Sequence, residues 1–323
     1  MFIFHNIHNY NLSLQYSLMT KHITTIAQFQ DKVLLNKLFL RAHEFSKMPL
    51  AEYPKPLQHL TVATLFYEPS TRTRLSFETA IQNLGANLIS TENAGSFSSA
   101  VKGETLEDSI MTISAYADAI VLRHPEIGAA DRASAVSNVS IINAGDGAGE
   151  HPTQAMLDGY TIFEEKGTLD GLSIGLVGDL LNGRTIHSLI QLLNQYDVTF
   201  YCIAPKQLQL PEKYQKLIEK SGQKMHLLNS WDDVLDKIDV LYMTRVQKER
   251  FKLIEDYMAV KDSFIVDMQI MKKLSKNAIV MHPLPRVNEI TTDVDSDPRA
   301  IYFKQVKNGL YMRMALLEML FEN

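Results

Sequence analysis

Residues 173–203 read SIGLVGDLLNGRTIHSLIQLLNQYDVTFYCI. Within this stretch, Ser173–Val177 is predicted as a β-strand, Thr185–Gln195 as a helix and Val198–Ile203 as a second strand. A helix between two short β-rich runs is typical of an α/β fold, in which parallel strands pair and helices cover the sheet.

The same alternation continues on both sides of this stretch. Further strands are predicted at Val62–Phe66, Ala119–Leu122, Ser140–Asn143, Asp239–Met243 and Ala278–Met281. Helices are predicted at Thr71–Leu84, after Thr153, after Ser230 and from about Asn308 to Leu320. We therefore expect an α/β protein of two domains, each a mainly parallel sheet flanked by helices, joined by the long helix that follows Thr153.

The composition of the 323-residue chain narrows its class. With 46% hydrophobic residues it can bury a full core, and its length suits domains of about 100–200 residues each. The net charge of -5 argues against a nucleic acid or a membrane as a partner, because both attract basic surfaces. Cys202 is the single cysteine, which fits a reducing cytoplasm. Residues 1–18 are expected to be a disordered extension or the product of translation from an upstream start codon, and their role remains open.

The motif EPSTRTR (residues 68–74) lies between a predicted strand and a predicted helix. Backbone N–H groups at a helix N-terminus bind phosphate, and the hydroxyl groups of Ser70, Thr71 and Thr73 add further donors. The planar guanidinium of Arg72 suits phosphate oxygens. On these residues alone, a phosphate site and a capped helix with two solvated arginines remain equally open.

Six further motifs follow this one: GSFSSAVKGET (95–105), RHP (123–125), HPTQ (151–154), GRT (183–185), MTRVQKER (243–250) and HPLPR (282–286). In this order they resemble the motifs of the aspartate and ornithine carbamoyltransferase family, from about Ile23 to the final helix. The resemblance implies transfer of the carbamoyl group of carbamoyl phosphate to the α-amine of L-aspartate, giving N-carbamoyl-L-aspartate and phosphate in pyrimidine biosynthesis. It also implies a carbamoyl-phosphate-binding domain at 19–150, with the C-terminal helix 306–323 packed on it, and an aspartate-binding domain at 151–305.

The resemblance also assigns roles to residues. Those that it implies for carbamoyl phosphate are Ser70, Thr71, Arg72, Thr73, Ser98, Lys102, Arg123, His151, Gln154, Pro283 and Leu284. Arg72, Thr73, Lys102, Arg123 and His151 are the implied catalytic residues. Thr73, Arg123 and His151 would donate to the carbonyl oxygen, where acyl transfer builds negative charge. Gln154 would contact the carbamoyl NH2 group, and Arg74 is expected to be structural and paired with an acidic residue.

The implied aspartate-binding residues are Lys102, Arg184, Arg245, Gln247 and Leu284. Two guanidinium groups suit a substrate with two carboxylates. In the family, Ser98 and Lys102 lie on a loop that reaches the neighbouring subunit, so the resemblance implies a homotrimer with shared active sites. Regulatory chains that form a larger assembly remain open.

Three alternatives compete with this interpretation. An ornithine carbamoyltransferase has cysteine where this chain has Pro283, and a catalytically silent scaffold would not need the intact arginines. A dinucleotide-binding protein is disfavoured because GLVGD (175–179) lacks the G-x-G-x-x-G pattern. No cofactor and no metal are expected, and no spacing resembles a metal site. No protein base is expected either, since phosphate itself can take the amine proton. Leu181-Asn182 departs from some relatives, which leaves cooperativity open. The sequence also leaves nucleotide regulation and kinetic constants open.

Overall fold

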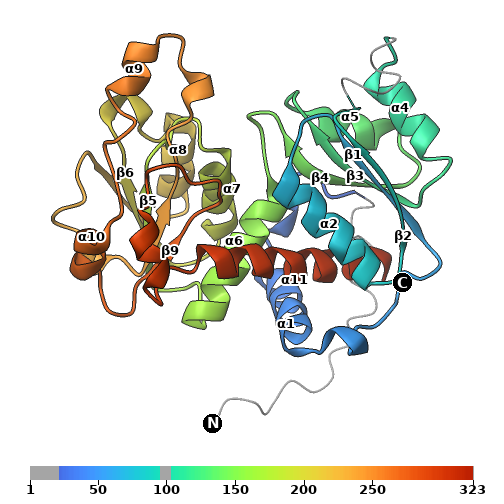
Figure 1. The fold of residues 1–323 in the computed structure, drawn as a ribbon, viewed down its shortest axis with the longest axis horizontal. Helices are drawn as coiled ribbons and strands as arrows, with labels where there is room; N and C mark the ends of the chain where they lie inside the picture. The colour runs from blue at the N-terminus through green and yellow to red at the C-terminus, as the bar shows by residue number, and fades with distance from the viewer. Residues whose placement is uncertain (1–21, 95–102, 323) are drawn as a thin grey trace.

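The computed structural model describes residues 22–94 and 103–322 and has two lobes, each built on one sheet (Figure 1). The strand order is β2-β1-β3-β4 in the first sheet and β7-β6-β5-β8-β9 in the second. Every strand pairing is parallel. The predicted α/β fold with two mainly parallel sheets is therefore confirmed, while the predicted extension at 1–18 lies outside the described residues.

The strands are β1 (Thr61–Phe66), β2 (Asn87–Glu92), β3 (Ala119–His124), β4 (Ser140–Asp146), β5 (Leu172–Val177), β6 (Val198–Ile203), β7 (Lys224–Leu228), β8 (Val240–Met243) and β9 (Ile279–Met281). The helices are α1 (Lys32–Lys47), α2 (Thr71–Asn83), α4 (Leu106–Ile113), α5 (Ala129–Val136), α6 (Pro152–Lys166), α7 (Arg184–Leu193), α8 (Glu212–Lys220), α9 (Ile254–Met258), α10 (Met268–Lys273) and α11 (Tyr302–Phe321).

Two of the predicted helices differ from the structure. The final helix, α11, begins at Tyr302, before the predicted start at Asn308. The helix predicted after Ser230 is wrong: the Ser230 hydroxyl accepts from the N–H of Asp232, but only a turn and a 3₁₀ helix at Leu235–Lys237 follow. A serine side chain that bonds the N–H two residues on supports a local turn as well as a helix, so this signal alone was weak.

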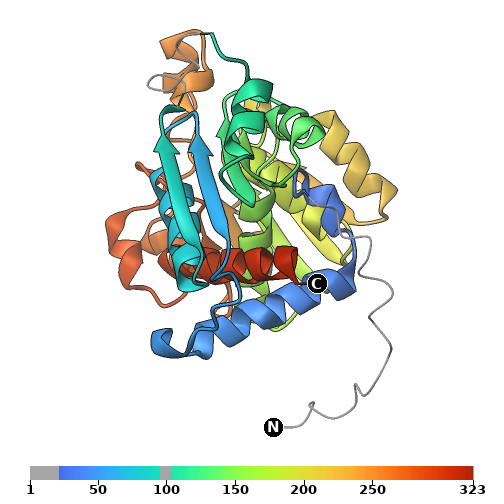
Figure 2. The same cartoon turned by 90° about the vertical axis from the view of Figure 1, so that its right-hand side faces the viewer.

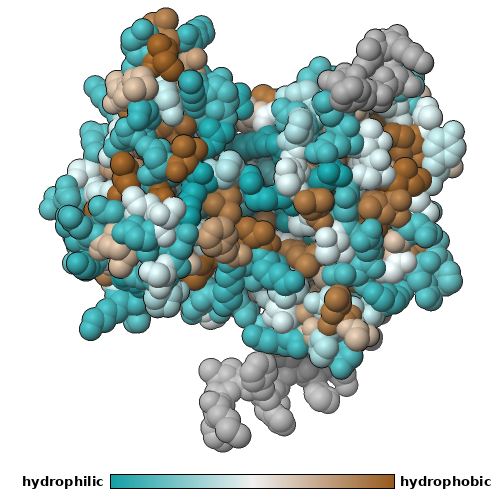
Figure 3. Space-filling view, in the orientation of Figure 1, coloured by the Kyte–Doolittle hydropathy of each residue, from teal (hydrophilic) through white to brown (hydrophobic). Residues whose placement is uncertain are grey.

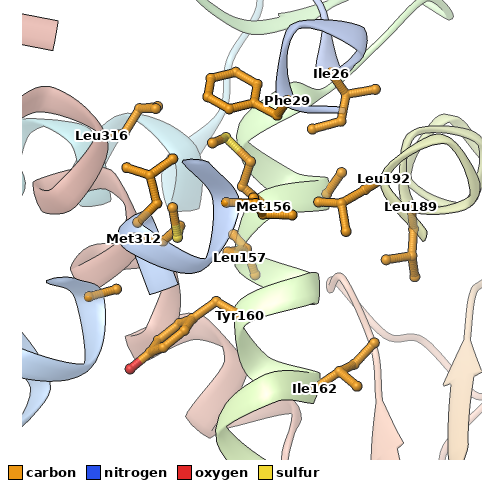
Figure 4. Packing of buried hydrophobic residues seen from close by; sticks show 14 of the residues in the cluster. Ile26, Phe29, Met156, Leu157, Tyr160, Ile162, Leu189, Leu192, Met312 and Leu316 are labelled. Carbon is orange, nitrogen blue, oxygen red and sulfur yellow. The ribbon is translucent and has the colours of Figure 1, made fainter. Parts of the chain in front are cut away.

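Helices α6 and α11 connect the lobes. One large cluster of buried apolar side chains extends along these helices and includes residues of both lobes. Figure 4 shows Met156 and Leu157 of α6 between Met312 and Leu316 of α11 on one side and Leu192 of α7 on the other. Burial of such side chains stabilises the fold by about 1.5–3 kcal/mol each, so α6 is held firmly from both lobes.

Helix α11 starts at the second lobe and returns along the first, where it packs against α1 and α2 (Figures 1 and 2). Its buried face covers most of its length, with buried residues spread from Tyr302 to Met319 and exposed ones between them. In the described part of the chain, no helix combines the length and the apolar character that crossing a membrane requires.

Candidate active site

A cavity of about 260 Å³ lies where loops and helix ends of the two lobes meet. In Figure 3 a hollow lined largely by hydrophilic residues separates the lobes on this side of the molecule. The cavity is lined by Ser70, Arg72, Thr73, Ser76, Arg123, His151, Gln154, Leu157, Gly183, Arg184, Thr185, Thr244, Arg245, Gln247, His282, Pro283, Leu284, Pro285, Gln305, Val306 and Arg313. These lining residues include five arginines and neither an aspartate nor a glutamate, so the cavity suits anionic ligands.

Most of these residues follow directly after strands. The motif EPSTRTR follows β1, His151 comes shortly after β4, and the segments 178–185, 244–247 and 282–285 follow β5, β8 and β9. Ligands of open parallel sheets bind outside the carboxyl ends of the strands. Both sheets therefore present these ends to the same cavity.

The first turn of α2 is arranged as an anion site. Its N-cap residue, Ser70, makes no side-chain cap bond within the described chain, and the helical bonding starts from the N–H of Arg74 to the Ser70 carbonyl at 3.0 Å. The backbone N–H groups before Arg74 therefore stay available to a ligand. Arg74 itself pairs with Glu78 at 3.2 Å and with Glu92 at 2.8 Å, as predicted for a structural arginine.

Two arginines and a histidine converge over Gly145. This glycine has a φ of +116°, and a Cβ atom there would lie 2.8 Å from Nη1 of Arg123 and 3.5 Å from both Nη2 of Arg184 and Cδ2 of His151. Arg123 donates from Nη1 to the carbonyl of Ala144 at 3.2 Å. The missing side chain of Gly145 thus lets three donors approach one another closely.

The charge of Arg123 is poorly compensated. Its nearest carboxylate is that of Glu68, 3.6 Å from Nη2, and its Nε atom is buried without a partner in the described chain. Burial, followed by repulsion from Arg184, lowers the pKa of Arg123 to about 10. The guanidinium is still charged at pH 7, so an anionic ligand would relieve an existing electrostatic cost.

His151 is the N-cap residue of α6 and is buried, with 4% of its surface exposed. Burial and the nearby Arg184, Arg123 and Arg313 lower its pKa well below the usual value of 6.5, so the imidazole is neutral at pH 7. Its buried Nδ1 atom has no hydrogen-bond partner among the described residues. A neutral imidazole carries one N–H, which it can donate to an oxygen that gains negative charge.

The second lobe contributes two more arginines. Arg184, at the start of α7, donates to the carbonyl of Gly147 in the first lobe. Arg245 pairs with Glu249, which raises the pKa of the Arg245 guanidinium. Gln247 donates from Nε2 to the carbonyl of Asn182 at 3.0 Å.

The turn after β9 has an unusual backbone. Leu284 has a φ of +51°, and its peptide bond to Pro285 is cis. The N–H of Leu284 donates to Nδ1 of His282 at 2.8 Å, and Nε2 of His282 lies 2.7 Å from Glu289. These contacts fix the backbone of the turn that lines the cavity.

The structure brings together the predicted residues Ser70, Arg72, Thr73, Arg123, His151, Gln154, Arg184, Arg245, Gln247, Pro283 and Leu284. Thr71 is exposed at the start of α2 and does not line the cavity, while Ser98 and Lys102 lie outside the described residues. Among the described residues, no three His, Cys, Asp or Glu side chains form a group suited to a metal ion.

Arg313 is a cavity residue that the sequence did not reveal. It lies in α11 and is 4% exposed, with its guanidinium carbon 5.0 Å from the centre of the Phe77 ring. Burial lowers its pKa to about 10, against the attraction of Asp158. The available signal was a charged residue within the apolar run that ends the chain, which amphipathic helices normally avoid.

Comparisons with known proteins agree with this geometry. Residues 21–164 match the model of the carbamoyl-P binding domain of aspartate/ornithine carbamoyltransferases, and residues 170–320 match the model of the Asp/Orn binding domain. A chloroplastic aspartate carbamoyltransferase of Oryza sativa subsp. japonica is 50% identical over 302 residues, covering 91% of this chain and 83% of that protein.

Two further matches cover nearly the whole of both partners. The aspartate carbamoyltransferase catalytic subunit of Vibrio cholerae is 48% identical over 303 residues, covering 93% of this chain and 96% of that protein. A crystal structure of aspartate transcarbamoylase from Trypanosoma cruzi in complex with N-(phosphonacetyl)-L-aspartic acid superposes with a TM-score of 0.88 at 41% identity, covering 94% and 97% of the two chains. The chain therefore belongs to the aspartate/ornithine carbamoyltransferase family.

Proposed function

We propose that this chain transfers the carbamoyl group of carbamoyl phosphate to the α-amine of L-aspartate, releasing N-carbamoyl-L-aspartate and phosphate in pyrimidine biosynthesis. The observation that carries the proposal is the cavity whose described lining contains five arginines and no carboxylate. The two substrates bring one phosphate and two carboxylates, which guanidinium groups bind in a bidentate manner. A Trypanosoma cruzi aspartate transcarbamoylase structure is a complex with carbamoyl phosphate and aspartate, which supports the same substrates here.

The proposed phosphate site is the first turn of α2. Ser70, Arg72 and Thr73 line the cavity there. The N-terminus of α2, with its free N–H groups and the positive end of the helix dipole, would face the phosphate. The family resemblance adds Thr71, Ser98 and Lys102 to this site.

The proposed reaction needs an amine, a carbonyl and a leaving phosphate. The deprotonated α-amine attacks the carbamoyl carbon, a C–N bond forms, the C–O bond to phosphate breaks, and phosphate carries away the amine proton. Arg123, His151 and Thr73 donate to the carbonyl oxygen, while Gln154 and the backbone at Pro283 and Leu284 hold the NH2 group. No protein base is required, so catalysis rests on positioning and on stabilising the developing charge.

Aspartate is proposed to bind on the side of the second lobe. Arg184 and Arg245 face its two carboxylates, Gln247 and Leu284 add polar contacts, and Lys102 is implied by the resemblance. The Glu249 carboxylate that now pairs with Arg245 would then share this guanidinium with the substrate.

Substrate choice tests this proposal directly. With carbamoyl phosphate, the protein is expected to carbamoylate L-aspartate and to leave L-ornithine nearly untouched. The lining residues that the structure describes offer cations to carboxylates and no carboxylate to an ammonium group. A colorimetric assay for the carbamoylated product, run with each amine separately, measures the preference. Equal or faster turnover of ornithine would contradict the proposal that L-aspartate is the substrate.

His151→Ala is expected to lower kcat by about 10²-fold, the scale for losing one donor to a developing oxyanion. The affinity for inorganic phosphate should change little, because the phosphate site lies at α2. His43→Ala is a control, since His43 pairs with Glu164 away from the cavity. Steady-state kinetics measure the loss of kcat, and phosphate titrations measure the affinity for phosphate. A normal kcat would mean that His151 has only a structural role.

Assembly, domains and location complete the proposal. We infer a cytoplasmic homotrimer with shared active sites, on the basis of the family resemblance; regulatory chains could enlarge it. We also infer a carbamoyl-phosphate-binding domain at 19–150 with 306–323 packed on it, and an aspartate-binding domain at 151–305. The two separate sheets and the contacts of α11 with α1 and α2 support that division.

A further inference from the structure

Asp158 is a buried carboxylate beside the cavity that the proposed mechanism does not use. It lies in α6, one helical turn after Gln154, and is 0% exposed. Burial raises its pKa to about 7, while its hydrogen bonds and the charge of Arg313 act in the opposite direction. Because a buried carboxylate is costly unless it is well bonded, its partners indicate its role.

Three side chains donate to Asp158, each from a different element. Nε2 of Gln154, in α6, lies 2.9 Å from Oδ1, and Nε2 of Gln305, in α11, lies 2.7 Å from the same oxygen. The hydroxyl of Tyr242, in β8, lies 2.6 Å from Oδ2. Asp158 therefore joins both lobes and the connecting helices at one buried point.

The carboxylate determines how both glutamine amides are turned. Oδ1 of Asp158 accepts from both glutamines, and a carboxyl oxygen without a proton can only accept, so each glutamine directs its NH2 group at Asp158 and its oxygen away. The oxygen of Gln305 accepts from the backbone N–H of His282 at 3.0 Å, which anchors the turn after β9. Gln154 lines the cavity, so its oxygen is the end of the amide left for a ligand.

We propose that Asp158 is a positioning residue that presents the Gln154 oxygen to the carbamoyl NH2 group, and so selects a carbamoyl group over an acyl group without N–H. The inference rests on the proposed function, in which Gln154 contacts that NH2 group. Carbamoyl phosphate donates an N–H to the fixed oxygen. Acetyl phosphate places a methyl group there and leaves the Gln154 oxygen unpaired, which costs binding free energy.

The test compares the dissociation constants of carbamoyl phosphate and acetyl phosphate by calorimetry. In Asp158→Leu, which removes the acceptor, the preference for carbamoyl phosphate should fall about tenfold, the factor for one hydrogen bond. Inorganic phosphate should bind as in the wild type, because its site is at α2. Asp158→Asn should keep the preference, since its carbonyl can face the two glutamines while Tyr242 accepts from the new NH2 group.

Further variants test whether Asp158 acts through Gln154. Gln154→Leu should lose the same preference, and adding Asp158→Leu to it should cause no further change, because both act through one hydrogen bond. Thr161→Val is a matched control: Thr161 is buried on the same helix and accepts from Asn308 of α11, away from the cavity. This control should keep the wild-type preference even if its thermal stability falls.

The outcomes are separable. A folded Asp158→Leu protein with the wild-type preference overturns the proposal. If that variant does not fold, an unchanged preference in Gln154→Leu, or a lost preference in Asp158→Asn, overturns it instead. Failure of the wild-type protein to carbamoylate aspartate would count against the proposed function, whereas the ratio of dissociation constants is measured without turnover.

Discussion

Arg123→Ala is expected to lower kcat/KM for carbamoyl transfer by about 10³-fold, the upper end for removing one donor from an oxyanion site. Arg123 lies at the point where the phosphate turn of α2, His151 and Arg184 converge, so its guanidinium can meet both the carbonyl oxygen and the phosphate. Loss of this cation should therefore weaken both substrate binding and the stabilisation of the transition state.

The same variant should not be less stable. The pKa of Arg123 is lowered to about 10 in the folded protein, below its value in the unfolded chain. At pH 7 the folded state therefore bears a cost for keeping this group charged, and alanine removes that cost. We expect the Tm without ligand to be unchanged or higher, and the increase in Tm on adding phosphate to be smaller than in the wild type.

Arg132→Ala is the matched control. Arg132 is an exposed arginine of α5 that pairs with Glu107 and Glu126 at 3.0 Å each. Exposed ion pairs contribute about 0–1 kcal/mol, so activity should stay within about twofold of the wild type. Wild-type activity in Arg123→Ala would contradict its catalytic role, and a large loss of Tm would make the arginine structural.

The central strands were predictable because they are buried on both faces. β1 and β3 are almost entirely buried, and their continuous apolar runs are the pattern of an inner parallel strand. The edge strands β2 and β7 were not predicted. All of their residues are exposed or half-buried, so neither strand carries the buried apolar run that marks an inner strand.

The site was predictable to the extent that its residues lie in motifs beside strand ends. Arg123, His151 and Arg184 come from three separate segments of sequence, and the structure places all three around Gly145. Gln305 and Arg313 could not be found in this way, because they reach the cavity from the last helix. The bond from Gln305 to Asp158 spans 147 residues, and only the packing of α11 against α6 creates it.

Two inactive proteins are expected to restore activity to each other if the active sites are shared. Arg72→Ala damages the main pocket, and Lys102→Ala damages the loop that family resemblance assigns to the neighbouring subunit. In a cyclic trimer each site joins the pocket of one subunit to the loop of the next. A pocket from the Lys102→Ala chain beside a loop from the Arg72→Ala chain then has both wild-type residues.

Random reassembly of equal amounts should restore about a quarter of the wild-type sites, because pocket and loop are each intact half the time in a cyclic arrangement. Each variant, dissociated and reassembled alone, should stay inactive, which excludes gain of activity from the treatment. The measurement is carbamoyl transfer after mild dissociation and reassociation, with mixed trimers identified by native mass spectrometry. Mixed trimers without activity would mean that Lys102 serves its own chain or has no catalytic role. The proposal of shared active sites would then be wrong. The proposal that carbamoyl transfer takes place in the arginine-lined cavity would not be affected.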